Sequence, residues 1–156
     1  MKRGFTLLEM ALVLAILGVL LAVGTPSLHG LIERHRAQAA ADALTQDLRN
    51  ARELAVLGGV PVHLSFGGDA GHWCWGVNRG GACDCGAALN ACNVSRTDGS
   101  RFAQVRLEQA TGAAFESRGQ THRPGETVFA TGAGDHYRVR MSLLGHARSC
   151  RQDKLC

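Results

Sequence analysis

The sequence is poor in aromatic residues and lacks the common catalytic motifs. Phenylalanine, tryptophan and tyrosine make up 5% of the chain, which predicts a modest hydrophobic core. There is no H-E-x-x-H zinc motif, no G-x-S-x-G nucleophile motif and no G-x-x-x-x-G-K-[ST] phosphate loop. The seven histidines are scattered along the chain and form no catalytic pattern. The sequence therefore gives no positive case for an enzyme, and we expect no cofactor and no metal.

Charge is almost absent near the N-terminus. Between Phe5 and Gly24 the only charged side chain is Glu9. A helix of about 20 residues rises about 30 Å, which matches the hydrocarbon core of a bilayer. Two cations, Lys2 and Arg3, precede it, so the pattern predicts a single-pass transmembrane helix over about residues 5–25 with its N-terminus in the cytoplasm. A discarded secretory signal is the alternative, but this stretch exceeds the usual ~7–15 apolar residues and lacks an A-x-A site.

Glu9 needs a partner, because a carboxylate inside an apolar helix costs several kcal/mol unless it is neutralised or paired. The nearest candidate cation is a free α-amino group. If the chain is cut after Gly4, Phe5 becomes the new N-terminus, and Glu9 lies about one helical turn away on the same face. In an oligomer, the carboxylate of one subunit would pair with the amine of the next.

These residues carry a resemblance. The segment Gly4-Phe5-Thr6-Leu7-Leu8-Glu9, behind a short basic leader, resembles the class III signal of type IV pilins and type II secretion pseudopilins. The resemblance implies that residues 1–4 are a leader peptide and that a prepilin peptidase cuts after Gly4. It also implies that the Phe5 amine is methylated to N-methylphenylalanine, and that Glu9 guides subunit assembly.

Residues 27–57 continue the helix with a different pattern. Apolar residues recur at spacings of three and four and leave a charged opposite face, which indicates an amphipathic helix. Gly58, Gly59 and Pro61 end it. We therefore expect one helix over residues 5–58, bent near residues 24–26, with its first half in the membrane and its second half packed on the globular domain.

From residue 60 onward the apolar period changes to two, which is typical of strands. Strands are expected at residues 62–66, 72–77, 102–107, 113–116, 126–131, 136–143 and 147–150, with a long loop over 78–99. The predicted fold class is α+β, with a long N-terminal helix packed on a small antiparallel β domain at residues 60–156. This is the type IV pilin-like plan, and it places the β domain outside the cytoplasm.

Two downstream segments narrow the resemblance. Residues 115–119 (FESRG) and 144–150 (LGHARSC) are similar to motifs of the GspH/FimT family of minor pilins and pseudopilins. That family implies other pilin subunits, the prepilin peptidase and the bacterial inner membrane as partners. The mature subunit would leave the inner membrane for a pilus or pseudopilus in the periplasm or outside the cell.

Six cysteines follow the apolar stretch, and an even number in a small exported domain predicts disulfides. Cys150 and Cys156 are expected to bridge and to hold the C-terminus. Cys83 and Cys85 are expected to have separate partners, for example Cys74 and Cys92. Zinc bound by these four cysteines and His72 is the alternative, but the C-x-C spacing is unlike the usual C-x2–4-C pair.

Cations gather near the C-terminus, although the formal net charge of the whole chain is only +4. The candidate DNA-binding residues are Arg138, Arg140, His146, Arg148, Arg151 and Lys154. In the FimT branch a G-R-x-R segment is associated with DNA capture. Gly145 and Arg148 match it, but His146 replaces the first arginine, and histidine is mostly neutral at pH 7. An ordinary solvated basic face is the alternative.

The predicted function is therefore a FimT-like minor pilin that enters a type IV pilus through its N-terminal helix. Double-stranded DNA, taken up for natural transformation, is the further partner that the basic cluster suggests. A GspH-like pseudopilin of a type II secretion system is the alternative.

Overall fold

The computed structural model describes residues 6–87 and 91–151, with the side chains of residues 21–27 outside the description. One helix, α1, covers Leu7–Gly58. It begins where Thr6 accepts hydrogen bonds from the amide of Glu9 through both its carbonyl and its hydroxyl oxygen. It ends at Gly58, and Gly59, with a positive φ of 64°, follows the last turn and donates its amide hydrogen to the Ala55 carbonyl. Residues 24–26, where the sequence suggested a bend, are assigned to the same helix.

The chain divides into two compact units, residues 1–32 and 33–156. In the first unit, the described large apolar side chains of α1 are all exposed, from 46% at Val13 to 90% at Leu7. Within the described residues, none of the helices combines the length and the apolar character needed to cross a membrane.

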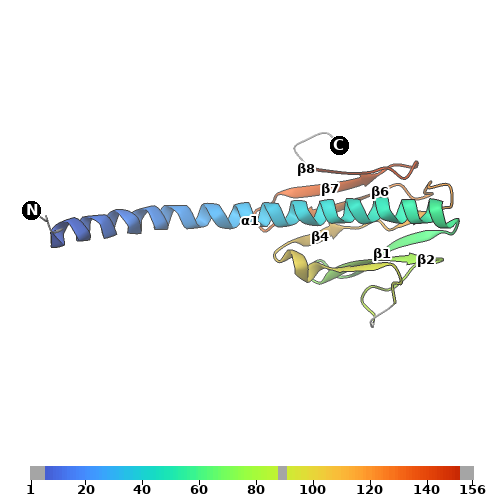
Figure 1. Ribbon diagram of the computed structural model, residues 1–156, viewed down its shortest axis with the longest axis horizontal. Coiled ribbons are helices and arrows are strands. Elements are labelled where there is room, and N and C mark those ends of the chain that lie inside the picture. Colours follow the sequence, from blue (N-terminus) through green and yellow to red (C-terminus); the bar gives the residue numbers. More distant parts are fainter. Residues whose placement is uncertain (1–5, 88–90, 152–156) are drawn as a thin grey trace, which may run out of the picture. The chain divides into compact units, whose positions relative to one another are not determined.

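The second unit contains two four-stranded antiparallel sheets behind the C-terminal half of α1 (Figure 1). The first sheet has the order β3-β2-β1-β5, with β1 at Val62–Gly68, β2 at Trp73–Arg79, β3 at Ser95–Asp98 and β5 at Ala113–Phe115. The second has the order β4-β6-β7-β8, with β4 at Arg106–Gln109, β6 at Gly125–Ala130, β7 at His136–Met141 and β8 at Ala147–Arg151.

A stripe of alanines and two leucines on α1 forms one wall of the core. Its buried members are Ala37, Ala40, Ala41, Leu44, Leu48, Ala51 and Ala55. The alanines let the helix backbone approach the sheets closely, and the aromatic side chains fill the space from the sheet side. Trp73 and Trp75 are both buried, and their indole N–H groups donate to the Val105 carbonyl at 3.0 Å and to the Asp47 carboxylate at 2.7 Å. The aromatic residues between Phe66 and Tyr137 are therefore concentrated in one core, and both indole N–H groups have acceptors.

Two disulfides cover the outer face of the β1–β2 hairpin, Cys74–Cys85 and Cys83–Cys92. Cys83 and Cys85 therefore have separate partners, as expected, and each of the four sulfur atoms is bonded to another cysteine. Cys150 is also disulfide-bonded, and Cys156, its predicted partner, lies outside the described residues. A side chain at Gly76 would overlap the Cys92 sulfur, so glycine is required beneath this bridge.

One strand was not predicted, and another begins later than expected. Residues 95–98, expected in a loop, form β3 and pair with residues 74–77 of β2. Their sequence, SRTD, shows no alternation of apolar and polar residues, and only Thr97 is buried. Residues 99–102 form a short 3-10 helix, η1 (Gly99–Phe102), capped by the Asp98 carboxylate, so β4 starts only at Arg106. Ala103, which falls within the expected strand 102–107, is exposed and lies in the connection between η1 and β4.

Candidate functional site

The N-terminal candidate site is only partly described. Gly4 and Phe5, the predicted cleavage and methylation residues, lie outside the described residues. Glu9 lies in the first turn of α1 with an exposed side chain. Its carboxylate makes no ion pair within the described part of the chain, and a negative charge in the first turn is favourable to the helix dipole. An intermolecular cation can therefore approach it.

The C-terminal candidate site is built on the β7–β8 hairpin. The antiparallel register places Arg140 directly opposite Arg148, and Arg138 opposite Cys150. Side chains alternate along β7, with Tyr137, Val139 and Met141 buried against the core. Arg138, Arg140 and Arg148 therefore share the outer face of the sheet.

The three arginines of this face differ in their neighbours. Arg138 is partly buried and lies 3.4 Å from the carboxylate of Glu126 on β6, which neutralises it. Arg140 and Arg148 are exposed, and neither makes an ion pair within residues 6–87 and 91–151. Like charges directly opposite each other on a sheet destabilise it. An anion bound between Arg140 and Arg148 would relieve that repulsion.

The turn between β7 and β8 is fixed by two glycines and one helix arginine. Gly145 has a φ of 74°, and a side chain there would overlap the carbonyl oxygen of Gly119, which also has a φ of 74°. Arg52 on α1 donates from its Nε to that same Gly119 carbonyl at 3.0 Å. The Gly119 and Gly145 turns, which carry the two family-like motifs of the sequence, therefore lie against each other and against Arg52.

His146 follows this turn, and its position is set by the hairpin backbone. Its amide donates to the hydroxyl of Ser142 at 3.2 Å, and its carbonyl accepts from the Ser142 amide at 3.1 Å. The His146 side chain is exposed. It borders two surface hollows, which it shares with Arg148.

The first hollow, of about 440 Å³, is lined by Arg140, Met141, Ser142, His146 and Arg148. The second, of about 400 Å³, is lined by Arg49, Arg52, Gly145, His146, Ala147 and Arg148. Neither lining contains a carboxylate. We call the exposed side chains around the two hollows, the three arginines Arg49, Arg140 and Arg148 together with His146, the cationic surface.

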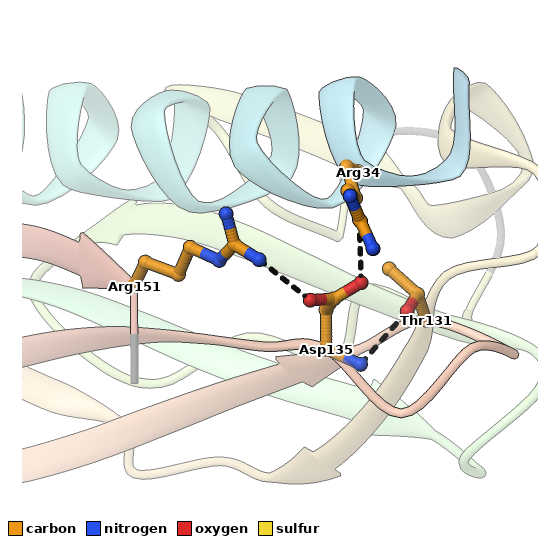
Figure 2. Close-up of polar contacts among 4 residues, drawn as sticks. All are labelled: Arg34, Thr131, Asp135 and Arg151. Atoms are coloured by element: carbon orange, nitrogen blue, oxygen red, sulfur yellow. Dashed lines mark hydrogen bonds and ion pairs between the residues drawn. The ribbon is translucent and has the colours of Figure 1, made fainter. Parts of the chain in front are cut away.

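Arg151 lies on the other face of β8, away from the cationic surface. It donates to the carboxylate of Asp135 at 2.8 Å, and Arg34 on α1 donates to the second carboxylate oxygen at 2.8 Å (Figure 2). The pKa of Asp135 is lowered, chiefly by the hydrogen bond from Arg34 and then by that from Arg151. Arg151 therefore serves helix–sheet attachment, and Lys154 lies outside the described residues.

Arg49 and Arg52 were missed as site residues, because their sequence context indicates only the polar face of a helix. Arg49 donates from one Nη to the carbonyl of Ala147 at 3.3 Å and is otherwise exposed. Their spacing of three residues puts both on one side of α1, but no local signal shows that the β7–β8 turn lies there.

Most of this chain matches a known protein family. Residues 40–145 match the model described as type II transport protein GspH, and this segment is more than half of the chain. The chain belongs to the GspH family. Residues 1–25 of this GspH-family chain also match the prokaryotic N-terminal methylation motif. Among curated proteins, none matches the chain.

Solved structures show the same fold. The minor pseudopilin EpsH from the type 2 secretion system of Vibrio cholerae is similar with a TM-score of 0.54 and 16% identity, over 76% of this chain and 99% of EpsH. The type IV minor pilin FimU of Pseudomonas aeruginosa is similar with a TM-score of 0.55 and 20% identity, over 80% of this chain and 95% of FimU. The predicted fold, a long helix packed on antiparallel sheets, is confirmed, and so is the resemblance to minor pilins and pseudopilins.

Proposed function

We propose that this chain is a minor subunit of a type IV pilus or of a type II secretion pseudopilus, and that it acts by assembly. The observation that carries this proposal is the apolar surface of α1 between Leu7 and Leu20, whose described large side chains are all exposed in the single chain. A helix that is apolar all round is stable only when something buries it. The family and its methylation motif make the helices of other pilin subunits the natural partner.

The proposed path has two steps. The precursor is held by residues 5–25 in the inner membrane with Lys2 and Arg3 in the cytoplasm, and the prepilin peptidase cuts between Gly4 and Phe5. The new amine of Phe5, methylated, then pairs with the Glu9 carboxylate of a neighbouring subunit as the helices pack together. The Glu9 side chain is exposed and makes no ion pair within residues 6–87 and 91–151, which supports this pairing.

Cleavage is tested by Gly4→Leu, which should leave the precursor uncut in a gel-mobility assay of cell extracts. Gly18→Leu is the control, since Gly18 lies in α1 with no atom within 4 Å of the added carbon. A mature-size band from the Gly4 variant would overturn the assignment of the cleavage site.

Assembly is tested by Glu9→Gln, which keeps the size of the side chain and removes its charge. The variant should be processed but absent from sheared filaments, whereas Glu53→Gln, at an exposed carboxylate further along α1, should be incorporated normally. Normal incorporation of the Glu9 variant would disprove the pairing.

The cationic surface supports a second function, the binding of double-stranded DNA by a displayed subunit. Arg140 and Arg148 lie opposite each other and make no ion pair with any described carboxylate, and the residues that line the two flanking hollows include no Asp or Glu. Such a surface favours backbone phosphates without regard to sequence. The match to the GspH model favours the pseudopilin alternative, which predicts a defect in protein secretion on deletion of the gene. The pilin function predicts a defect in piliation or DNA uptake.

DNA binding is tested with the full-length chain in detergent and a labelled duplex. Arg148→Gln should weaken binding and reduce its dependence on salt. Arg106→Gln is the matched control, because Arg106 is exposed on β4, at the opposite edge of the same sheet. If the wild-type chain does not bind the duplex at low salt, this second function is wrong.

A further inference from the structure

We infer that Arg49 on α1 is a direct phosphate contact of the cationic surface, so that the DNA-binding site joins the helix to the β7–β8 hairpin. This inference rests on the DNA-binding function proposed above. It adds a ligand-binding residue that lies about 100 positions away from the C-terminal cluster in the sequence but beside it in the fold, as the hydrogen bond between Arg49 and Ala147, with a separation of 98, shows.

The two hollows form one continuous surface, because His146 and Arg148 border both of them. On the sheet side, Arg140 completes the first hollow. On the helix side, Arg49 and Arg52 complete the second. A polyanion that lies across the Arg148 side chain therefore meets cations on both sides, whereas the β7–β8 hairpin alone supplies cations on only one side.

The two helix arginines have different tasks. Arg52 is half-buried, and its Nε donates to the Gly119 carbonyl beneath the turn, so it holds the turn in place. Arg49 is exposed and uses only one Nη hydrogen, in a long contact of 3.3 Å to Ala147. A guanidinium carries five N–H donors, so most donors of Arg49 stay available for a phosphate.

The acidic groups near Arg49 do not neutralise it. Glu53 lies one helical turn further along α1 with an exposed side chain, and it forms no ion pair with Arg49 in the described part of the chain. Asp42, two turns in the other direction, accepts the hydroxyl hydrogen of Ser149 at 2.6 Å. Arg49 therefore lines the second hollow and makes no ion pair with a carboxylate among the residues that the structure describes.

The experiment measures the dissociation constant of the full-length chain for a labelled DNA duplex over a series of salt concentrations. Each phosphate neutralised by a cation contributes about 0.9 to the slope of log K against log salt. Arg49→Gln should lower the slope by about 0.9. Relative to binding at 1 M salt, this weakens binding at 0.1 M salt by 10 raised to the power 0.9, which is about eightfold. Arg106→Gln should leave both quantities unchanged.

Arg49→Lys separates a phosphate contact from a structural role. Lysine keeps the positive charge, so the salt slope should return to the wild-type value. If the lysine variant also loses the slope, Arg49 acts through its contact with Ala147, and its assignment as a phosphate contact is wrong. Tryptophan fluorescence and the thermal midpoint verify folding. If Arg49→Gln is unstable, Arg49→Met, which keeps the aliphatic stem, replaces it.

The outcomes distinguish this inference from the function on which it rests. If the wild-type chain fails to bind DNA, both are wrong. If the wild type binds and Arg148→Gln lowers the slope while Arg49→Gln does not, the hairpin binds DNA without the helix, and only this inference is overturned.

Discussion

Replacing Gly145 by alanine should destabilise the protein by two separable effects. Gly145 has a φ of 74°, a left-handed conformation that costs an L-residue about 1–2 kcal/mol. The added carbon would also overlap the carbonyl oxygen of Gly119 and lie 3.0 Å from the Cδ of Arg52. Displacing two packed turns costs about 1–3 kcal/mol more, so the total loss is about 2–5 kcal/mol.

Gly134 provides the matched control for this substitution. It also has a positive φ, 85°, but no atom lies within 4 Å of a carbon added there. Gly134→Ala should therefore lose only the conformational part, about 1–2 kcal/mol. For a unit of this size 1 kcal/mol shifts the unfolding midpoint by about 4 °C, so the two variants should differ by about 4–12 °C.

The assay follows the emission of Trp73 and Trp75, which are buried in the same core, during thermal unfolding of the oxidised chain. If the midpoints of the two variants agree within roughly 2 °C, the close packing of the Gly145 turn on the Gly119 turn is refuted. The Gly145 variant should also weaken DNA binding, because the turn positions His146 and Arg148.

Three further predictions concern other parts of the molecule. Asp135→Asn should cost about 1–2 kcal/mol at neutral pH, since it weakens charged hydrogen bonds to Arg34 and Arg151 that are partly exposed to water. Because the pKa of Asp135 is lowered from its ordinary value of 3.8, its contribution is complete above that value and is lost as the pH falls through the lowered pKa. Urea unfolding of both proteins between pH 7 and pH 2.5 should show the stability difference shrink toward the acid end, and a constant difference would contradict the ion pair. Gly76→Ala should prevent clean closure of the Cys83–Cys92 bridge, detected as free thiols after oxidation, whereas Gly81→Ala, with no atom within 4 Å, should oxidise fully. His146→Arg restores the first arginine of G-R-x-R and should raise the salt slope of DNA binding by about 0.9, and an unchanged slope would place His146 outside the site.

Local patterns predicted most of the fold. The helix over residues 5–58 and the hairpin of β6 and β7 follow from the apolar period and from glycine positions, and both were found close to the expected bounds. β3 was missed because it is a short, polar strand at the edge of its sheet. Only one of its residues is buried, so its sequence shows no period-two pattern of apolar residues. Its pairing with β2 depends on contacts that are distant in the sequence.

The candidate site was predicted less completely than the fold. Arg138 and Arg140 lie on the outer face of β7, as the alternation of side chains along a strand requires. Arg151 was grouped with them although it is three residues from Arg148, and an odd spacing on one strand puts two side chains on opposite faces. The expected strand ended at residue 150, whereas β8 includes Arg151.

Features that depend only on neighbours in the chain could be read from the sequence without the structure. These are the N-terminal methylation motif, the uncharged run interrupted by Glu9, the change of period after Pro61 and the even number of cysteines. The tertiary structure decided which cations lie together. The sheet register places Arg140 opposite Arg148, and the packing of α1 brings Arg49 to the same surface. Arg151 instead donates a hydrogen bond to Asp135. The physical reason is that strand register and helix rotation are set by the shared core, whose contacts join residues far apart in the chain.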